Sequence, residues 1–242
     1  MPGIATVGAL PGMGTQQDAL GRRIFWTQDG KKLVPGGLVI DGTNSRDVGN
    51  LSVSGASNGD VLRAGTVLGK ITGGFYAPSI IGALTTAYTT AGATNTVLNT
   101  TAAVAVEIVR RIGTSGNINV VAATTGNAAV ASVATQNATF SAVNTTSGQI
   151  TITALSAAAA NGGFLCPVDG SGTPRCLVAK EDGVEVVDRF GSSYNAQLPE
   201  ALVGGAVESK QITNYPTDTG LQAWLKAALR AVGYAYLFSD DF

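Results

Sequence analysis

One short string in the chain has residue types that could bind a nucleotide phosphate, Gly65-Thr-Val-Leu-Gly69-Lys70. A phosphate-binding loop needs Gly, four residues and then Gly-Lys-Ser/Thr, because its backbone wraps the phosphate and the hydroxyl binds Mg²⁺. Here three residues separate the two glycines, and Ile71 replaces the hydroxyl residue. A strand-like segment follows instead of a helix, so no helix N-terminus would meet the anion. The string is therefore predicted to be a β-strand bent at its glycines.

The other residues that could support catalysis or metal binding form no recognisable motif. The chain has no histidine, the commonest proton shuttle and metal ligand near neutral pH. The string Gly12-Met-Gly14 lacks the preceding strand and the third glycine of a dinucleotide fingerprint. Asp240 and Asp241 are predicted to be a solvated tail, and a serine–lysine dyad stays open although no motif marks one. We therefore expect a protein that is not an enzyme, with no catalytic residue, no cofactor and no metal.

Two cysteines, Cys166 and Cys176, lie on either side of the turn-forming stretch PVDGSGTPR. This spacing would allow them to face each other on a hairpin and form a disulfide. Two isolated cysteines without CxxC spacing are more often small, free, buried side chains. Both states remain open, and free thiols are favoured.

The chain is poor in charge for its length. Of its 242 residues 13% are charged, the formal net charge is −1, and no run of Lys and Arg exceeds two residues. A nucleic-acid-binding protein of this size normally carries a basic face, so no nucleic acid partner is expected. No apolar run is long enough to span a bilayer, and the N-terminus lacks the features of a signal peptide, so no membrane partner is expected either. Such low charge is common in proteins that work inside large assemblies.

The spacing of glycine, proline and apolar residues divides the chain into segments with different predicted structures. Residues 1–50 have closely spaced Gly and Pro and are predicted to be an extended N-terminal arm. Residues 51–83 and 161–210 contain short alternating runs and Asp-Gly turns, which predict a single β core. Residues 84–160 are predicted to be an inserted α+β subdomain, and residues 211–242 a C-terminal helix and tail.

Helix signals are clear in 100–113 and 218–233, where apolar residues recur at helical spacing between a capping residue and a glycine. Glu107 is predicted to pair with Arg110 and Arg111 on a solvated helix face, with an inter-subunit contact as the alternative.

Alternating runs at 117–124, 130–144 and 148–155 predict a small antiparallel sheet in the inserted block. The expected fold class is mainly β (α+β). It comprises a small β-barrel or β-tulip-like core with the inserted helix-plus-sheet subdomain, the N-terminal arm and the C-terminal helix.

Three strings of the β core resemble the head decoration (capsid cement) proteins of tailed bacteriophages. They are AGTVLGKIT, GFYAP and PVDGSGTPRCLVA, at 64–72, 74–78 and 167–179. The larger relatives of that family also show similar strings, which correspond here to 38–50, 104–112, 140–155 and 218–242. The chain departs from the short members in its length, in its inserted block and in its C-terminal helix.

The resemblance implies a virion protein that binds the major capsid protein on the capsid exterior and stabilises the expanded shell, after assembly in the host cytoplasm. Such proteins typically form homotrimers and use an N-terminal arm to pair with capsid strands. The residues expected to contact the capsid are Arg22, Arg23, Phe25 and Trp26. From residue types alone, Phe25 and Trp26 could equally fold onto the chain's own core.

Two other functions are compatible with the same sequence. A second β-rich virion component, such as a head–tail connector or a tail or fibre-base protein, would have a similar composition. A carbohydrate-binding module for the host surface would need aromatic platforms, and only Trp26, Trp224 and a few Tyr and Phe are available.

Overall fold

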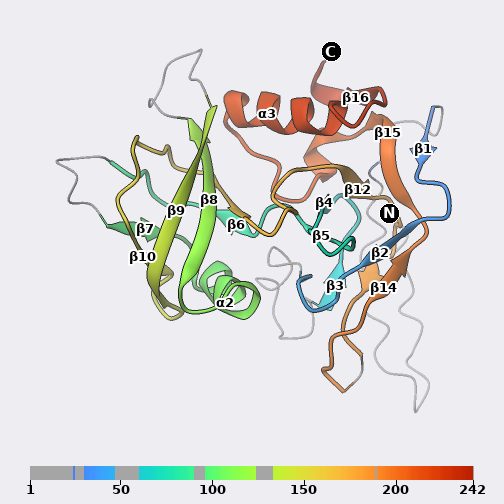
Figure 1. Ribbon diagram of the computed structural model, residues 1–242. Coiled ribbons are helices and arrows are strands. Elements are labelled where there is room, and N and C mark those ends of the chain that lie inside the picture. Colours follow the sequence, from blue (N-terminus) through green and yellow to red (C-terminus); the bar gives the residue numbers. More distant parts are fainter. Residues whose placement is uncertain are drawn as a thin grey trace, which may run out of the picture.

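The computed structural model describes residues 24, 30–46, 60–89, 96–123, 133–188 and 190–241. In this part of the chain the protein is mainly β, as predicted, with two α-helices and two strand-rich lobes (Figure 1). None of the described helices has the length and apolar character needed to cross a membrane.

The main sheet has eight strands and curls into a half-barrel. In spatial order its strands are β1 (Lys32–Leu33), β15 (Ala201–Val207), β12 (Cys176–Val178), β4 (Val67–Lys70), β5 (Tyr76–Pro78), β2 (Leu38–Ile40) and β14 (Ala196–Leu198), with β16 (Tyr236–Phe238) also paired to β15. The pairs β2–β5 and β15–β16 are parallel. A two-stranded sheet, β3 (Val61–Leu62) and β13 (Val184–Glu185), contributes to the apolar cluster on one face of the main sheet.

The second sheet has six strands and carries a helix on one face. Its spatial order is β6 (Gly82–Ala83), β11 (Phe164–Pro167), β8 (Gly116–Ala123), β9 (Val133–Asn144), β10 (Gln149–Ile152) and β7 (Val97–Asn99). Helix α2 (Ala102–Arg111) packs Val104 and Ile108 against this face. The block predicted at 84–160 thus forms most of this sheet, and β6 and β11, which precede and follow the block in the sequence, together extend one edge of it.

Both helices form where the sequence predicts them. In α2 the Thr101 hydroxyl accepts a hydrogen bond from the Val104 amide (3.2 Å), and Gly113 follows the helix with a φ of +118°. Helix α3 (Thr219–Arg230) begins after Asp218, whose carboxylate accepts a hydrogen bond from the Leu221 amide (2.8 Å). These caps satisfy amides that have no partner inside the helix.

Helix α3 lies across both sheets and joins them (Figure 1). Its buried leucines Leu221, Leu225 and Leu229 belong to one apolar cluster with Val121 of the second sheet and Leu202 of the main sheet. A helix buried on both lobes restricts their relative movement, because separating them would expose this shared apolar surface.

Part of the predicted N-terminal arm lies in the main sheet. Lys32–Leu33 pairs with β15, and Leu38–Ile40 lies between β5 and β14. Leu38 and Ile40 are buried while Val39 between them is exposed, which is the alternation of a strand. Because these described residues pair with strands of the main sheet, they belong to the core rather than to an arm. The closely spaced glycines and prolines still leave room for a strand of three residues.

Two short 3-10 helices complete the C-terminal part, η3 (Ser209–Gln211) and η4 (Ser239–Asp241). Between them β16 runs parallel to β15, pairing Tyr236 with Gly205 and Phe238 with Val207. The segment predicted as a helix and tail therefore also supplies a strand to the main sheet.

Candidate functional site

The predicted capsid-contact residues lie outside the described residues; they are Arg22, Arg23, Phe25 and Trp26. Ile24 between them is described. Its side chain is fully buried in the cluster under α3, and its carbonyl oxygen accepts a hydrogen bond from the Glu208 amide (2.8 Å). Ile24 itself is therefore part of the protein's core.

The string Gly65–Lys70 forms a turn and then strand β4, which confirms the strand prediction. Gly65 has a φ of +86°, a conformation that favours glycine. After Lys70 the chain makes a tight turn, closed by the hydrogen bond from the Gly74 amide to the Ile71 carbonyl oxygen (2.9 Å), and enters β5. No helix N-terminus follows, so the geometry of a phosphate-binding loop is absent.

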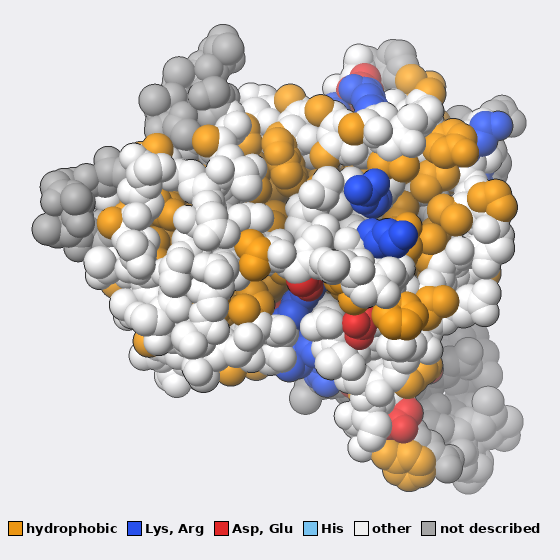
Figure 2. All heavy atoms as spheres, viewed as in Figure 1, with side chains coloured by type: hydrophobic (Ala, Val, Ile, Leu, Met, Phe, Trp, Pro, Cys, Tyr) orange, Lys and Arg blue, Asp and Glu red, His pale blue; other side chains and the backbone are white. Residues whose placement is uncertain are grey.

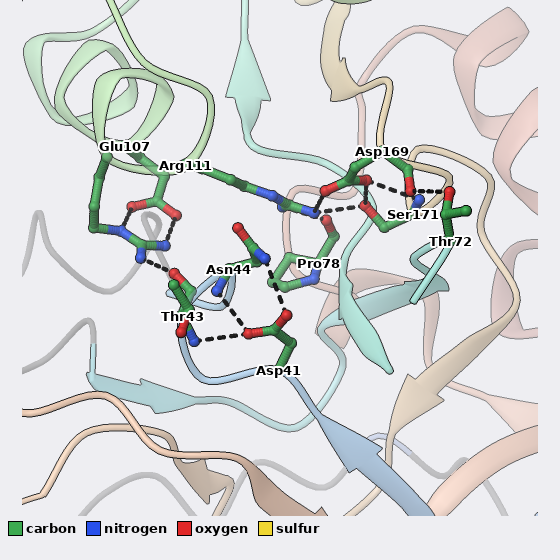
Figure 3. A network of polar contacts seen from close by, with 10 residues as sticks. Asp41, Thr43, Asn44, Thr72, Pro78, Glu107, Arg111, Asp169 and Ser171 are labelled. Atoms are coloured by element: carbon green, nitrogen blue, oxygen red, sulfur yellow. Dashed lines mark hydrogen bonds and ion pairs between the residues drawn. The ribbon is translucent and has the colours of Figure 1, made fainter. Parts of the chain in front are cut away.

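A buried arginine connects the two lobes. Arg111 is the last residue of α2, and its side chain is 1% exposed. Its guanidinium donates to the Pro78 carbonyl oxygen (2.8 Å), to Asp169 Oδ2 (3.1 Å) and to Ser171 Oγ (2.5 Å), as Figure 3 shows. The helix of the second sheet is thus bonded to the end of β5 and to the turn before β12.

The turn that receives Arg111 is itself held in place. Asp169 Oδ1 accepts hydrogen bonds from the Ser171 amide (2.9 Å) and hydroxyl (2.5 Å). The Asp169 carbonyl oxygen accepts from the amide (2.9 Å) and the hydroxyl (3.0 Å) of Thr72. Burial alone would raise the pKa of Asp169, but the charge of Arg111 and the hydrogen bonds from Ser171 outweigh it and lower that pKa.

Glu107 and Arg110 form a second polar bridge from α2. Arg110 donates to both Glu107 oxygens (2.6 and 2.5 Å) and to the Thr43 carbonyl oxygen. Thr43 lies in the loop after β2, where Asp41 caps the Thr43 and Asn44 amides (Figure 3). The Glu107 side chain is only 4% exposed. The prediction of a solvated helix face is therefore wrong: this face of α2 is buried in the seam between the lobes.

The role of Asp169 in shaping its turn could have been predicted from the local sequence. Asp-x-Ser is a sequence in which the carboxylate can accept hydrogen bonds from the residue two positions later, as it does here. The residue types of this stretch predict only a turn. That the turn would meet a helix about 60 residues earlier could not be derived from periodicity.

The C-terminal aspartates are exposed, as predicted, but they form an ion cluster with α3 instead of a free tail. Lys226 Nζ lies 2.8 Å from Asp240 Oδ1 and 2.8 Å from Asp241 Oδ1, and Arg230 Nη2 lies 2.5 Å from Asp241 Oδ2. The Tyr215 hydroxyl also donates to Asp240 (2.5 Å). These contacts hold the residues after β16 against the helix.

Burial alone would raise the pKa of Asp240, but hydrogen bonds from Lys226, Ser209 and Tyr215 outweigh it and lower the pKa to about 2. A carboxyl whose pKa is lower in the folded state stabilises that state above its unfolded pKa, and this contribution is lost as the pH falls through the folded value.

We therefore expect the wild-type protein to lose stability from the Asp240 contacts between about pH 4 and about pH 2. Asp240→Asn should be less stable at neutral pH and should lose less stability over that acidic interval. Urea unfolding followed by tryptophan fluorescence at several pH values measures both effects. Asp182→Asn, at an exposed turn position, serves as the control. Equal acid sensitivity of wild type and Asp240→Asn would contradict the assignment.

The two cysteines are free and buried, and they lie in different sheets. Burial raises the pKa of both the Cys166 and the Cys176 thiols to about 12, so neither is a thiolate near neutral pH. Within the described ranges, no group of three or more Cys, Asp and Glu side chains is arranged to hold a metal ion.

Large exposed apolar side chains are spread over several elements. Phe190 is the most exposed of them, at 78%, in the loop between β13 and β14, and Tyr194 in the same loop is 42% exposed. The Asp188 carboxylate accepts hydrogen bonds from the Phe190 and Ser192 amides (2.8 Å each), which shapes this loop. These hydrogen bonds lie beside the exposed Phe190 ring.

Comparison with known proteins gives no relative: no family model, no curated protein and no solved structure matches the chain.

Proposed function

We propose that the chain is a structural protein of a bacteriophage virion that binds the outer surface of the capsid and stabilises the expanded shell. The observation that carries the proposal is the arrangement of the three strings that resemble decoration proteins. They contain β4, β5 and β12, and β4 pairs with both others, Leu68 lying opposite Pro78 and opposite Cys176. Strings from both ends of a long insertion thus form one continuous three-stranded unit, as a shared ancestral core would require.

The composition and the surface support the same proposal. A protein that is covered by neighbours gains little from surface charge, and this chain has 13% charged residues against roughly a quarter in ordinary soluble domains. The proposed partners are the major capsid protein and further copies of the chain in a homotrimer. Binding only to the assembled shell would stabilise that shell by mass action. The protein would have no enzymatic activity.

The copy number in purified virions of the encoding phage tests this proposal. A decoration protein repeats with the symmetry of the shell, so we expect on the order of hundreds of copies. Quantitative gel electrophoresis against the major capsid protein measures the ratio. About a dozen copies or fewer per particle would overturn the proposal and favour a connector or fibre-base protein.

The N-terminal segment is proposed to contribute to capsid binding, and the buried Ile24 sets the limit for a truncation. We expect deletion of residues 1–23 to leave the melting temperature unchanged and to weaken capsid binding at least about tenfold, or about 1.4 kcal/mol. Deletion of residues 1–30 would also remove a fully buried core side chain, so its loss of binding could reflect unfolding. Co-sedimentation with capsids and thermal melting measure the two quantities.

Phe25→Ala/Trp26→Ala in the full-length chain separates the two roles left open for the aromatic pair. If the two rings are capsid anchors, the double substitution should weaken capsid binding without changing the melting temperature. A lowered melting temperature with unchanged capsid affinity would show instead that the rings pack on the chain's own core. Capsid occupancy equal to wild type after deletion of 1–23 would remove that segment from the binding site.

A further inference from the structure

The second lobe is almost free of charge. Between residues 82 and 167 the chain has three charged residues, Glu107, Arg110 and Arg111. An ordinary soluble segment of this length would have about 20. All three lie on α2 and are used in the seam with the main sheet. The outer face of the second sheet, opposite α2, therefore has no charge of its own.

This outer face is an ordered array of amide and hydroxyl side chains. Asn117 lies opposite Thr139, and Asn119 opposite Asn137, on β8 and β9. The Thr139 hydroxyl donates to Asn117 Oδ1 (2.8 Å), and Asn137 Nδ2 donates to Asn119 Oδ1 (3.2 Å). On β10 the exposed residues continue the array with Gln149 and Thr151. We call these six residues the amide face.

Figure 2 shows this side of the molecule, with no Lys, Arg, Asp or Glu side chain visible over β8, β9 and β10. Two surface hollows, of about 430 and 460 Å³, lie at its margins. One includes Thr135 and Trp224 in its lining, the other Val97 and Thr151, and neither is lined by a charged residue. The hollows beside the amide face are therefore uncharged. The hollows around the C-terminal cluster differ, because their linings include Lys226 and Asp240.

We infer that the amide face is a contact surface between copies of this chain, buried against the nearly uncharged second lobe of another copy. Asn, Gln and Thr side chains each provide donors and acceptors, so two such surfaces can satisfy one another. A charged partner surface would have to bury its ions without counter-charges, which costs several kcal/mol for each ion. The chain itself supplies an uncharged surface of this kind, and a net charge of −1 gives little repulsion between copies.

This inference deepens the proposed function by naming the surface through which copies meet, and it rests on that function only for the expectation of an assembly. Its test uses the full-length protein in solution, without capsids. Sedimentation velocity should give a multiple of 24.4 kDa. The association should be equally strong in about 0.05 M and about 1 M NaCl, because the interface has no ion pairs for salt to screen.

A matched pair of variants locates the contact. Gln149→Lys places a charge on the amide face, and Gln197→Lys places one at an exposed position of β14 in the main sheet. Both positions are exposed, so both variants should melt within a few degrees of wild type. We expect Gln149→Lys to weaken self-association at least about tenfold, Gln149→Lys/Thr151→Lys to abolish it, and Gln197→Lys to leave it unchanged.

Three results would overturn the inference. The first is a wild-type protein that stays monomeric at all concentrations, and the second is equal weakening by Gln149→Lys and Gln197→Lys. The third is unchanged self-association of Gln149→Lys together with lost capsid binding, which would assign the amide face to the capsid. A low copy number in virions would refute the capsid proposal and leave the solution result standing, so the two failures can be told apart.

Discussion

Gly69→Ala is expected to lower the free energy of unfolding by at least about 3 kcal/mol. A Cβ atom at this position would overlap the carbonyl oxygen of Ser171 and lie 2.5 Å from the carbonyl oxygen of Thr173. Both are backbone atoms, so no change of rotamer can relieve the overlap. The 171–173 turn would have to move away from β4, which would also disturb the turn that binds Arg111.

Gly73→Ala is the matched control, since a Cβ atom there would meet nothing within 4 Å. We expect its unfolding free energy to stay within about 0.5 kcal/mol of wild type. Urea unfolding followed by tryptophan fluorescence compares the two variants directly. A Gly69→Ala variant as stable as Gly73→Ala would show that the turn can shift without cost.

The helices and the strands of the second sheet were predictable because their signals are local. Apolar spacing, a capping residue and a terminal glycine define α2 and α3, and the observed ends lie within three residues of the predicted ones. Strand alternation predicted β8, β9 and β10 for the same reason. For the Gly65–Lys70 string, the sequence predicted a strand with glycine bends. The need for Gly69 depends on a turn 100 residues later and could not be predicted.

The seam was not predictable, because a polar helix face looks the same whether it meets water or another lobe. Glu107, Arg110 and Arg111 have the spacing of a solvated face, but tertiary packing buries Glu107 and Arg111 and leaves Arg110 only partly exposed. The C-terminal Asp240 is exposed as predicted, but its ion pair with Lys226 of α3 could not be derived from its position in the sequence. Periodicity assigns residues to faces, while the partner of each face is decided by contacts far apart in the sequence.

Asp169→Ala is expected to lower the free energy of unfolding by about 3 kcal/mol, because it removes the carboxylate that is hydrogen-bonded to the buried guanidinium of Arg111. The Arg111 side chain is 1% exposed, whereas that of Asp169 is 36% exposed, so the arginine bears most of the cost. Burial lowers the pKa of Arg111, and Asp169 acts in the opposite direction. The variant also removes the acceptor of the Ser171 amide. Calorimetry and urea unfolding measure the loss.

A double-mutant cycle separates the ion pair from the general damage to the turn. Arg111→Met keeps much of the buried aliphatic volume and removes the charge, so Arg111→Met/Asp169→Ala has no uncompensated ion in the seam. We expect the double variant to be more stable than the sum of the single changes predicts, by at least about 1 kcal/mol. Additivity within about 0.3 kcal/mol would mean that the two side chains act independently. Arg111 belongs to α2, which packs on the second sheet, and Asp169 precedes β12 of the main sheet. A positive coupling energy would therefore measure how strongly the ion pair holds the two sheets together.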